Sequence, residues 1–468
     1  FKKRMRLDES FGVIDRRLDI GGREATLLLV DGFIKDDVML QIQRYLQGID
    51  KVDISFENNL KKLIDQIPYV EVDKTDEIDT VITMVLSGNL AVIIDGIPTA
   101  ILIDARTYPV RGISEPELEK VTRGSRDGFT ETIVFNTALI RRRIRDPQLT
   151  FSITQVGVRS RSDVVIGYIN DIANHDLVDE IKRKIDKVNT DSLEMTEKTL
   201  EEFIMGRNWN PLPKARFTER PDVAAAHLLE GHIVVIVDNS PSVMILPVTL
   251  FHFTQHAEDY YQSPLVGTYF RWVRIVGILL SLFLPAIWLL LLGYQDNLPD
   301  FLGIVVPKEM NDIGIMVQIL ILEFGIDLLR LASIHTPNVL ASSLGIIGGL
   351  ILSEFAIRAG WFIPETILCM AVATIGMFAT PSIEFSMAIR LLRIGLILLT
   401  GFFKLFGCIL GLIIIIIIFS KTTTLGGLKY TWPLFPFDRK GMATLLLRKP
   451  IPEVKSRPDF LKPIDKDE

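Results

Sequence analysis

The distribution of apolar residues divides the chain into two regions with different patterns. In residues 1–265, short apolar runs alternate with charged residues, as in water-soluble proteins. Between residues 270 and 420, the apolar segments are much longer and few charges interrupt them. A helix needs about 20 apolar residues to cross a bilayer, and segment 272–293 supplies that length with a single charge, Arg274. We therefore expect a soluble region followed by a membrane domain.

Three short apolar runs in the soluble region have the composition of buried strands. They are residues 25–30, 90–94 and 233–237, and each is followed by an aspartate and a turn-forming residue. Other stretches show the apolar spacing of amphipathic helices, namely residues 76–86, 129–144 and 175–188. Because strand and helix patterns alternate along the chain, the sequence predicts a mixed α/β fold for this region.

An internal repeat indicates that the soluble region contains two related units. Residues 87–103 and 230–245 share a glycine, an apolar run, an aspartate and a proline in the same order. The matching pairs are Gly88 and Gly231, Asp95 and Asp238, and Pro98 and Pro241. A helix that ends at a glycine and leads into two strands joined by a turn explains this order. We predict one cytosolic α/β subdomain in residues 1–145 and a second in residues 146–265. The repeat is either a duplicated structural unit or the frame of a paired ligand cleft.

Arginines are concentrated in segment 115–145, beside nearly as many carboxylates. The candidates for an interdomain or partner contact are Arg123, Arg126, Arg141, Arg142 and Arg143. Guanidinium groups form paired hydrogen bonds with carboxylates and phosphates, so lipid headgroups are also possible ligands. The alternative is a salt-bridged helix face, because the carboxylates of the segment balance its positive charge.

Five hydrophobic segments predict an all-α polytopic transmembrane domain in residues 266–420. They cover about 270–293, 313–334, 339–358, 363–380 and 386–419. The third and fourth are short, so either could be re-entrant, and the fifth is long enough to be tilted or broken. Arg271 and Arg274 at the start of the first segment favour the cytosolic side for the soluble region. Five full crossings would put the polar C-terminal tail, residues 421–468, outside, although its basic residues favour the cytosol.

Ionisable residues inside the hydrophobic segments are the main candidates for function. A charge in hydrocarbon is costly unless it is paired or hydrated. Glu323 and Asp327 are two like charges four residues apart on one helix face, which favours a cation path or a subunit contact. The full set of these candidates is Glu323, Asp327, Arg330, Glu354 and Arg358. The candidates for close helix packing and gating are Gly345, Gly348 and Gly349.

The composition argues against several classes of function. The formal net charge of −6 shows no footprint for nucleic-acid binding. Cys369 and Cys408 lie in apolar segments, so no disulfide framework is expected. The six histidines are scattered along the chain, and no catalytic triad, metal-ligand cluster or glycine-rich phosphate loop is apparent. No apolar run follows the basic residues near the amino terminus, so no signal peptide is expected. We therefore expect no enzymatic activity, no cofactor and no bound metal.

Several motifs are similar to those of a known family. They are DGF at 31–33, RGSRDGFTETIVFNTALIRRRI at 123–144, EFGIDLLRLASIHTP at 323–337 and LGIIGGLIL at 344–352. Together they resemble the A-subunit-type proteins of the GerA family of bacterial spore germination receptors. The block at 123–144 is the most specific of them, and the resemblance extends over nearly the whole chain.

The resemblance implies a multi-pass protein of the bacterial endospore inner membrane, with its soluble region facing the spore core. It also implies ring-like homo-oligomers with a channel for monovalent cations, and contact with other germination membrane proteins or a small membrane partner. The leading hypothesis is a channel or channel subunit that releases ions or amplifies the response during germination. The alternatives are a non-conducting scaffold of a receptor cluster and a secondary transporter.

Overall fold

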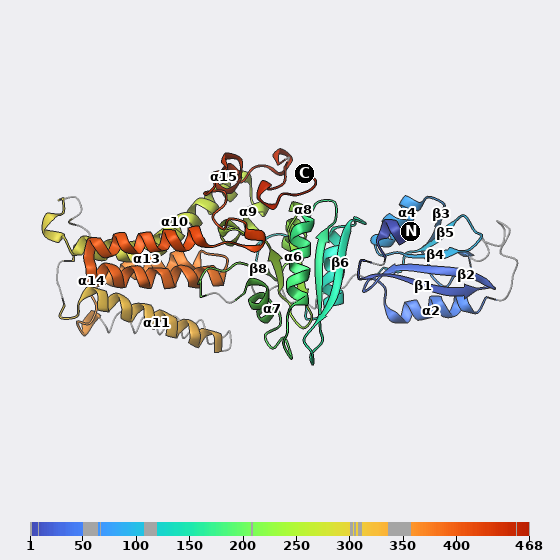
Figure 1. Ribbon diagram of the computed structural model, residues 1–468, viewed down its shortest axis with the longest axis horizontal. Coiled ribbons are helices and arrows are strands. Elements are labelled where there is room, and N and C mark those ends of the chain that lie inside the picture. Colours follow the sequence, from blue (N-terminus) through green and yellow to red (C-terminus); the bar gives the residue numbers. More distant parts are fainter. Residues whose placement is uncertain are drawn as a thin grey trace.

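The computed structural model describes residues 2–7, 9–49, 64–65, 67–106, 119–206, 209–299, 303, 306–307, 311–335, 357–454 and 456–467. The molecule is elongated, with one α/β unit at one end, a second in the middle and long helices at the other end (Figure 1). The chain begins in the first unit and ends beside the second (Figure 1). Four of the candidate residues, Gly345, Gly348, Gly349 and Glu354, lie outside the described residues.

The first α/β unit is built on a five-stranded antiparallel sheet with the order β1-β2-β4-β5-β3. The elements are α1 (Lys2–Met5), β1 (Val13–Ile20), β2 (Arg23–Val30), α2 (Asp36–Gln47), β3 (Val72–Thr75), α4 (Ile78–Leu86), β4 (Leu90–Ile94) and β5 (Ala100–Ile103). Successive strand residues point to opposite faces. Leu27 therefore packs with Leu46 of α2, whereas Leu28 packs with Val85 of α4 on the other face.

The second unit repeats this architecture with the strand order β6-β7-β9-β10-β8. Its strands are β6 (Leu149–Val156), β7 (Ser162–Ile169), β8 (Arg216–Thr218), β9 (Ile233–Val237) and β10 (Val243–Leu246). Its helices are α5 (Ile133–Arg143), α6 (His175–Asp186), α7 (Thr196–Met205) and α8 (Pro221–Glu230). One sheet face packs with α6 and α7, and the other with α5 and α8. The predicted mixed α/β fold is confirmed.

The repeated sequence occupies the same place in both sheets. It forms the end of α4 with β4 and β5 in the first unit, and the end of α8 with β9 and β10 in the second. Gly88 and Gly231 both have left-handed backbone conformations, with φ of +106° and +99°. This conformation strains residues that carry a Cβ atom. The glycines therefore recur because both helices end in the same sharp turn into a buried strand.

The helical region begins after the 3-10 helix η1 (Leu250–Thr254) and the short helix α9 (Glu258–Tyr261). Its long helices are α10 (Pro264–Leu292), α11 (Ile315–His335), α13 (Pro364–Phe378) and α14 (Ile383–Lys421), with the 3-10 helix η2 (Gln295–Asn297) after α10. Among the described residues, α10 and α14 are long and apolar enough to cross a membrane, and α13 is a shorter apolar helix.

Helix α14 is a hairpin of two halves rather than one straight rod. Lys404 breaks it with a φ of 49° and a ψ of −129°. Gly411 lies against the side chain of Leu396, and Gly407 lies against the carbonyl of Leu399. In a continuous helix, residues 396 and 411 would be roughly 22 Å apart. The fifth hydrophobic segment is therefore broken, as the sequence analysis allowed.

The final segment is packed on the second α/β unit. It contains η4 (Leu425–Gly427), α15 (Arg439–Leu446), η5 (Ile451–Glu453) and η6 (Asp459–Leu461). Tyr430 and Leu461 are fully buried, and the Ile464 amide donates to the Ile172 carbonyl at 2.9 Å. The segment thus lies at the end of the helical region where α10 begins.

Candidate functional site

Four charged side chains meet inside the helical region. Glu323 of α11 is 2% exposed and lies between Arg390 and Arg393 of α14, which are 1% and 0% exposed. Its carboxylate oxygens lie 3.1 Å from Arg390 Nε and 2.5 Å from Arg393 Nε. The half-buried Asp327 lies 2.5 Å from Arg390 Nη1 through its Oδ1 atom. We call these four residues the buried charge network.

The buried charge network connects three helices. Arg393 Nη2 donates to Glu323 Oε2 at 2.9 Å, while Arg393 Nη1 donates to Ser281 of α10 at its hydroxyl (2.8 Å) and its carbonyl (3.1 Å). The contacts of Arg390 Nε and Arg393 Nε are close but poorly aligned for hydrogen bonding, so they act mainly through charge. Two acids balance two arginines, which lowers the cost of burying them. The network therefore holds α10, α11 and α14 together.

The acids of this network were candidates from the sequence, but the two arginines were not. Glu323 and Asp327 were predicted to mark a cation path or a subunit contact, and in the structure both are paired within the chain. Arg390 and Arg393 lie three residues apart on one face of α14, opposite two acids four residues apart on α11. That complementary spacing was the available signal.

Arg330 and Arg358 are the other two candidates among the described residues. Arg330 is half-buried on α11 and places Nη1 2.9 Å from Met387 Sδ. Arg358 is exposed at the start of the segment that leads to α13. Glu354, its predicted pairing partner, lies outside the described residues, so that pair stays a prediction.

The five candidate arginines of segment 123–143 occupy different environments. Arg141 is a buried residue of α5 that donates to the carbonyls of Asp146 (2.9 Å) and Leu149 (2.7 Å), and burial lowers its pKa to about 10. Arg143 pairs with Asp127 at 2.6 Å. Burial alone would raise the pKa of Asp127, but hydrogen bonds from Arg143 and Ser125 outweigh it and lower that pKa. The remaining three, Arg123, Arg126 and Arg142, are exposed.

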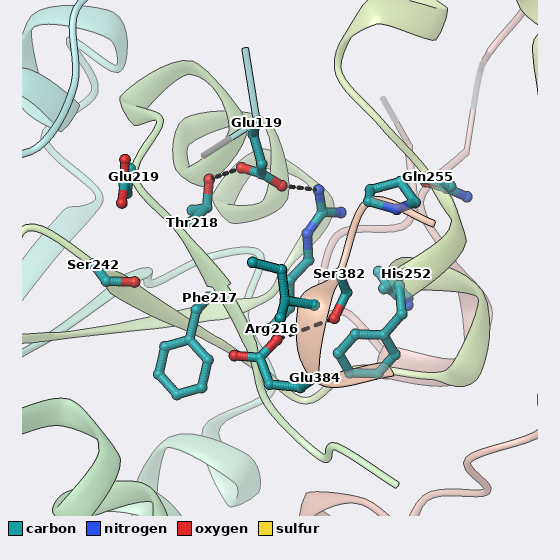
Figure 2. Close-up of a pocket in the computed structure, with 13 residues that line it drawn as sticks. Glu119, Arg216, Phe217, Thr218, Glu219, Ser242, His252, Gln255, Ser382 and Glu384 are labelled. Atoms are coloured by element: carbon teal, nitrogen blue, oxygen red, sulfur yellow. Dashed lines mark hydrogen bonds and ion pairs between the residues drawn. The ribbon is translucent and has the colours of Figure 1, made fainter. Parts of the chain in front are cut away.

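A small cavity of about 90 Å³ lies between β8 and the amino end of α14 (Figure 2). On its β8 side, Glu119 accepts hydrogen bonds from Arg216 at 3.0 Å and Thr218 at 2.6 Å. On its α14 side, the Ser382 hydroxyl accepts from the Phe385 amide and donates to Glu384 at 3.1 Å (Figure 2). Polar groups of the second α/β unit thus face the first turn of a long apolar helix.

The start of α10 is attached to the soluble part by a second ion pair. Asp259 of α9 is fully buried and accepts two hydrogen bonds from Arg274, at 2.8 and 3.0 Å. Arg271 donates to the Thr444 carbonyl of α15 at 2.8 Å. The two arginines expected at the membrane boundary are therefore also structural anchors. They join the foot of α10 to α9 and to the final segment.

Three histidines that are distant in the sequence converge in the second α/β unit. His227, His232 and His252 are buried, and one potential ligand atom of each lies within 4.8 Å of the others. These histidines are scattered along the sequence, which therefore showed no metal-ligand cluster. They converge because the end of α8, the start of β9 and η1 meet in the folded structure.

Comparison with known proteins gives matches across most of the chain. A family model described as Bacillus/Clostridium GerA spore germination protein matches residues 2–460. Stage V sporulation protein AF of Bacillus subtilis (strain 168) is 43% identical over 464 residues, which cover 99% of this chain and 94% of that protein. Spore germination protein GerLA of Bacillus cereus is 33% identical over 410 residues, 87% of this chain and 83% of that protein.

Among solved structures, a match is found with a domain of a germinant receptor. It is the crystal structure of the N-terminal domain of the A subunit of the Bacillus megaterium spore germinant receptor GerK3. The match has 27% sequence identity and a TM-score of 0.41, and it covers 52% of this chain and 90% of that chain.

Proposed function

This chain belongs to the GerA family of spore germination proteins, and from that premise we propose that it is a membrane subunit of a spore germination complex. Its site of action would be the inner membrane of the endospore, with both α/β units and the final segment on the core side. The helical region would act as a monovalent-cation channel or as one subunit of a ring-like channel. The relatives named as spore germination and sporulation proteins support the process, and the helices α10 and α14 support the membrane setting.

The positions of the ends of α10 and α14 support a multi-pass arrangement. The chain enters α10 beside η1, and the break of α14 at Lys404 lies beside Gly293 at the far end of α10. Both ends of α14 return to the second α/β unit, where Phe385 stacks on Phe253 and Phe419 faces Tyr430. Each half of α14 has about 17–21 residues, close to the length required for a crossing. An even number of crossings would keep the basic final segment in the core compartment.

The buried charge network is the observation that supports the proposed channel role. Charged groups at membrane depth are expensive and often mark ion paths or moving contacts. Glu323 is enclosed by arginines, so we assign it to holding α10, α11 and α14 in a closed arrangement. Asp327 is the more exposed acid, with 34% of its side chain accessible, and is the better candidate for contact with a passing cation. A movement of α10 or α14 relative to α11 would alter both roles at once.

The joint between the soluble part and the helices gives the proposal a route for gating. The Arg274–Asp259 pair anchors α10, and the cavity beside β8 lies at the amino end of α14. A partner that shifts the second α/β unit would therefore pull on two helices of the network. The exposed Arg123, Arg126 and Arg142 are candidates for the contact with that partner.

A non-conducting scaffold is the second candidate, and one observation favours it. All four charges of the network are paired inside a single chain, so no ion is required to satisfy them. In that case the network would only stabilise helix packing. The chain would then organise receptor subunits without moving ions.

Potassium efflux from sealed liposomes distinguishes the two candidates. The purified full-length protein would be reconstituted with and without its membrane partner, and its oligomer size measured on the same sample. We expect efflux from the wild type, and a several-fold lower rate for Asp327→Asn, because that change removes one acid while Glu323 still pairs with both arginines. Glu365→Gln, at the amino end of α13, serves as the matched control and should retain the wild-type rate.

The outcomes of the efflux experiment distinguish a cation channel from a non-conducting scaffold. Efflux that falls only in Asp327→Asn, with the oligomer intact, supports a cation path beside this residue. No efflux from a fully assembled wild type with its partner supports the scaffold. Equal losses in Asp327→Asn and Glu365→Gln would exclude a specific role for Asp327.

A further inference from the structure

The histidine cluster of the second α/β unit has the proportions of a small metal site. His227 is in the last turn of α8, His232 follows the glycine that ends this helix, and His252 is in η1. The ring centroids are 5.0 to 5.8 Å apart. Nitrogen ligands of tetrahedral zinc are roughly 3.4 Å apart, given Zn–N bonds of about 2.0–2.1 Å. Ligand atoms within 4.8 Å can reach that spacing through small side-chain rotations.

Two of the three rings are already in the tautomer that binds a metal. Nδ1 of His227 lies 2.8 Å from the Val223 carbonyl, and Nδ1 of His232 lies 2.8 Å from the Pro247 carbonyl. A carbonyl oxygen can only accept, so both Nδ1 atoms carry the hydrogen. Each Nε2 atom therefore presents a lone pair. Metal-binding histidines commonly use their second nitrogen in this way, which fixes the ring orientation.

The third ring, His252, can adopt the same tautomer through Thr249. Its Nδ1 accepts a hydrogen bond from the Thr249 amide at 3.1 Å and lies 2.9 Å from the Thr249 hydroxyl oxygen. When the hydrogen of this neutral ring moves from Nε2 to Nδ1, the hydroxyl oxygen can accept it. Nε2 then becomes available, and the hydrogen bond from the Thr249 amide to Nδ1 is lost.

One lone pair in the cluster has no partner in the described part of the chain. His232 is 0% exposed, and its Nε2 atom has no hydrogen-bond donor there. A buried polar atom without a protein partner can be satisfied by a bound ligand. The Oε2 atom of Glu230 lies 3.7 Å from this nitrogen. Glu230 and His252 also line a cleft of about 130 Å³, which provides an entry path.

The electrostatic environment keeps the rings neutral. Burial lowers the pKa of His232 to about 3 and holds those of His227 and His252 well below the ordinary value. Neutral imidazole is the form that binds a metal. Arg216 adds an unfavourable positive charge, but Glu119 pairs with it at 3.0 Å.

The first α/β unit shows that the fold itself does not require these histidines. Its equivalent positions are Met84 and Asn89, which form the same backbone hydrogen bond at 3.0 Å that His227 and His232 form at 2.9 Å. The turn is therefore the same with or without histidine. The second unit has histidine at both positions and receives a third from η1.

We propose that His227, His232 and His252 bind a zinc-class divalent cation, with Glu230 or a water molecule as the fourth ligand. Three imidazoles suit zinc and its neighbours among the transition metals, whereas calcium and magnesium prefer oxygen ligands. The ion joins the end of α8 to η1, the segment that leads into α9 and α10. It therefore stabilises the connection between the second α/β unit and the first long helix.

Metal binding by the purified full-length protein in detergent tests this proposal. Zinc content would be measured by elemental analysis, zinc affinity by competition with a coloured chelator, and ligand geometry by the visible absorption of Co²⁺. We expect one zinc per chain, a tetrahedral Co²⁺ spectrum that zinc abolishes, and a melting temperature that rises with zinc and falls with EDTA.

Two variants identify the ligands. His232→Asn removes Nε2 but retains a donor for the Pro247 carbonyl, and should weaken zinc affinity by at least about 100-fold. His175→Asn changes an exposed histidine on α6 and should bind zinc as the wild type does. If His232→Asn fails to fold by circular dichroism, the wild-type Co²⁺ spectrum and melting shift decide. A folded wild type without zinc, or a folded His232→Asn with unchanged affinity, would overturn the proposal.

Discussion

The two α/β units have the same strand order but different surroundings. In the first unit, the apolar residues of both sheet faces pack among themselves, with Ala138 of α5 as the main addition from outside. In the second, the face that carries α5 and α8 belongs to one apolar cluster that continues into α10, α13 and α14. The same topology therefore serves once as an end piece and once as the base of the helical region.

The polar residues follow this difference. The second unit contains three buried histidines, the fully buried Arg220 and the cavity at the foot of α14. At the matching places of the first unit, Met84 and Asn89 replace two of the histidines. Both units thus share one frame, and among the described residues the unit that touches the helices carries the buried titratable groups. The following predictions test this division.

The largest effect is expected from removing one buried ring in each unit. Phe253→Ala and Phe33→Ala should each lower the free energy of unfolding by about 3–5 kcal/mol, because both rings are almost fully buried. Phe253 stacks on Phe385 of α14, whereas Phe33 packs within the first unit. Hydrogen-exchange mass spectrometry should show lost protection in β9 and α14 for Phe253→Ala, but only in the first unit for Phe33→Ala. Loss of protection in both units from either change would contradict their independence.

An intermediate effect is expected from acid in metal-free protein. His232 has a folded pKa of about 3 and an ordinary value near 6.5, so between these values the unfolded chain binds a proton that the folded chain does not. The contribution of His232 to the free energy of unfolding is therefore intact above about pH 6.5 and falls by about 2 kcal/mol at pH 5. Asn89 at the matching position does not titrate. Chemical denaturation in EDTA should give a lower free energy of unfolding for the second unit at pH 5 than at pH 7. His232→Asn should remove the share of this loss that belongs to His232, while His227 and His252, whose pKa values burial also lowers, keep theirs.

The smallest effect is expected at the two helix-ending glycines. Gly88→Ala and Gly231→Ala should each cost about 1–2 kcal/mol, because both residues have left-handed backbones. Gly88→Ala should cost more, since its new Cβ would lie 2.8 Å from the Phe33 ring, whereas the nearest atom to a Cβ at Gly231 is 3.4 Å away. Thermal melting of the two variants would measure the difference. A greater loss for Gly231→Ala would mean that the ion site, and not the turn, controls this position.

Local sequence patterns were sufficient for much of the α/β architecture. The runs 90–94 and 233–237 coincide with β4 and β9, and the helix predicted at 175–188 corresponds to α6. The repeat also placed both cap glycines correctly. These features depend on residues near one another in the chain, where apolar spacing and backbone freedom act directly.

The candidate sites depended on contacts that local patterns do not contain. The sequence by itself determined that two acids lie within a long apolar segment and that the fifth hydrophobic segment is longer than one crossing requires. Only the tertiary structure decided that α14 folds back at Lys404, that Arg390 and Arg393 meet Glu323, and that three histidines converge. The physical reason is that a buried charge or a buried imidazole is satisfied by groups many residues away. The chain sets which groups are available, and the packing of helices and sheets sets which of them meet.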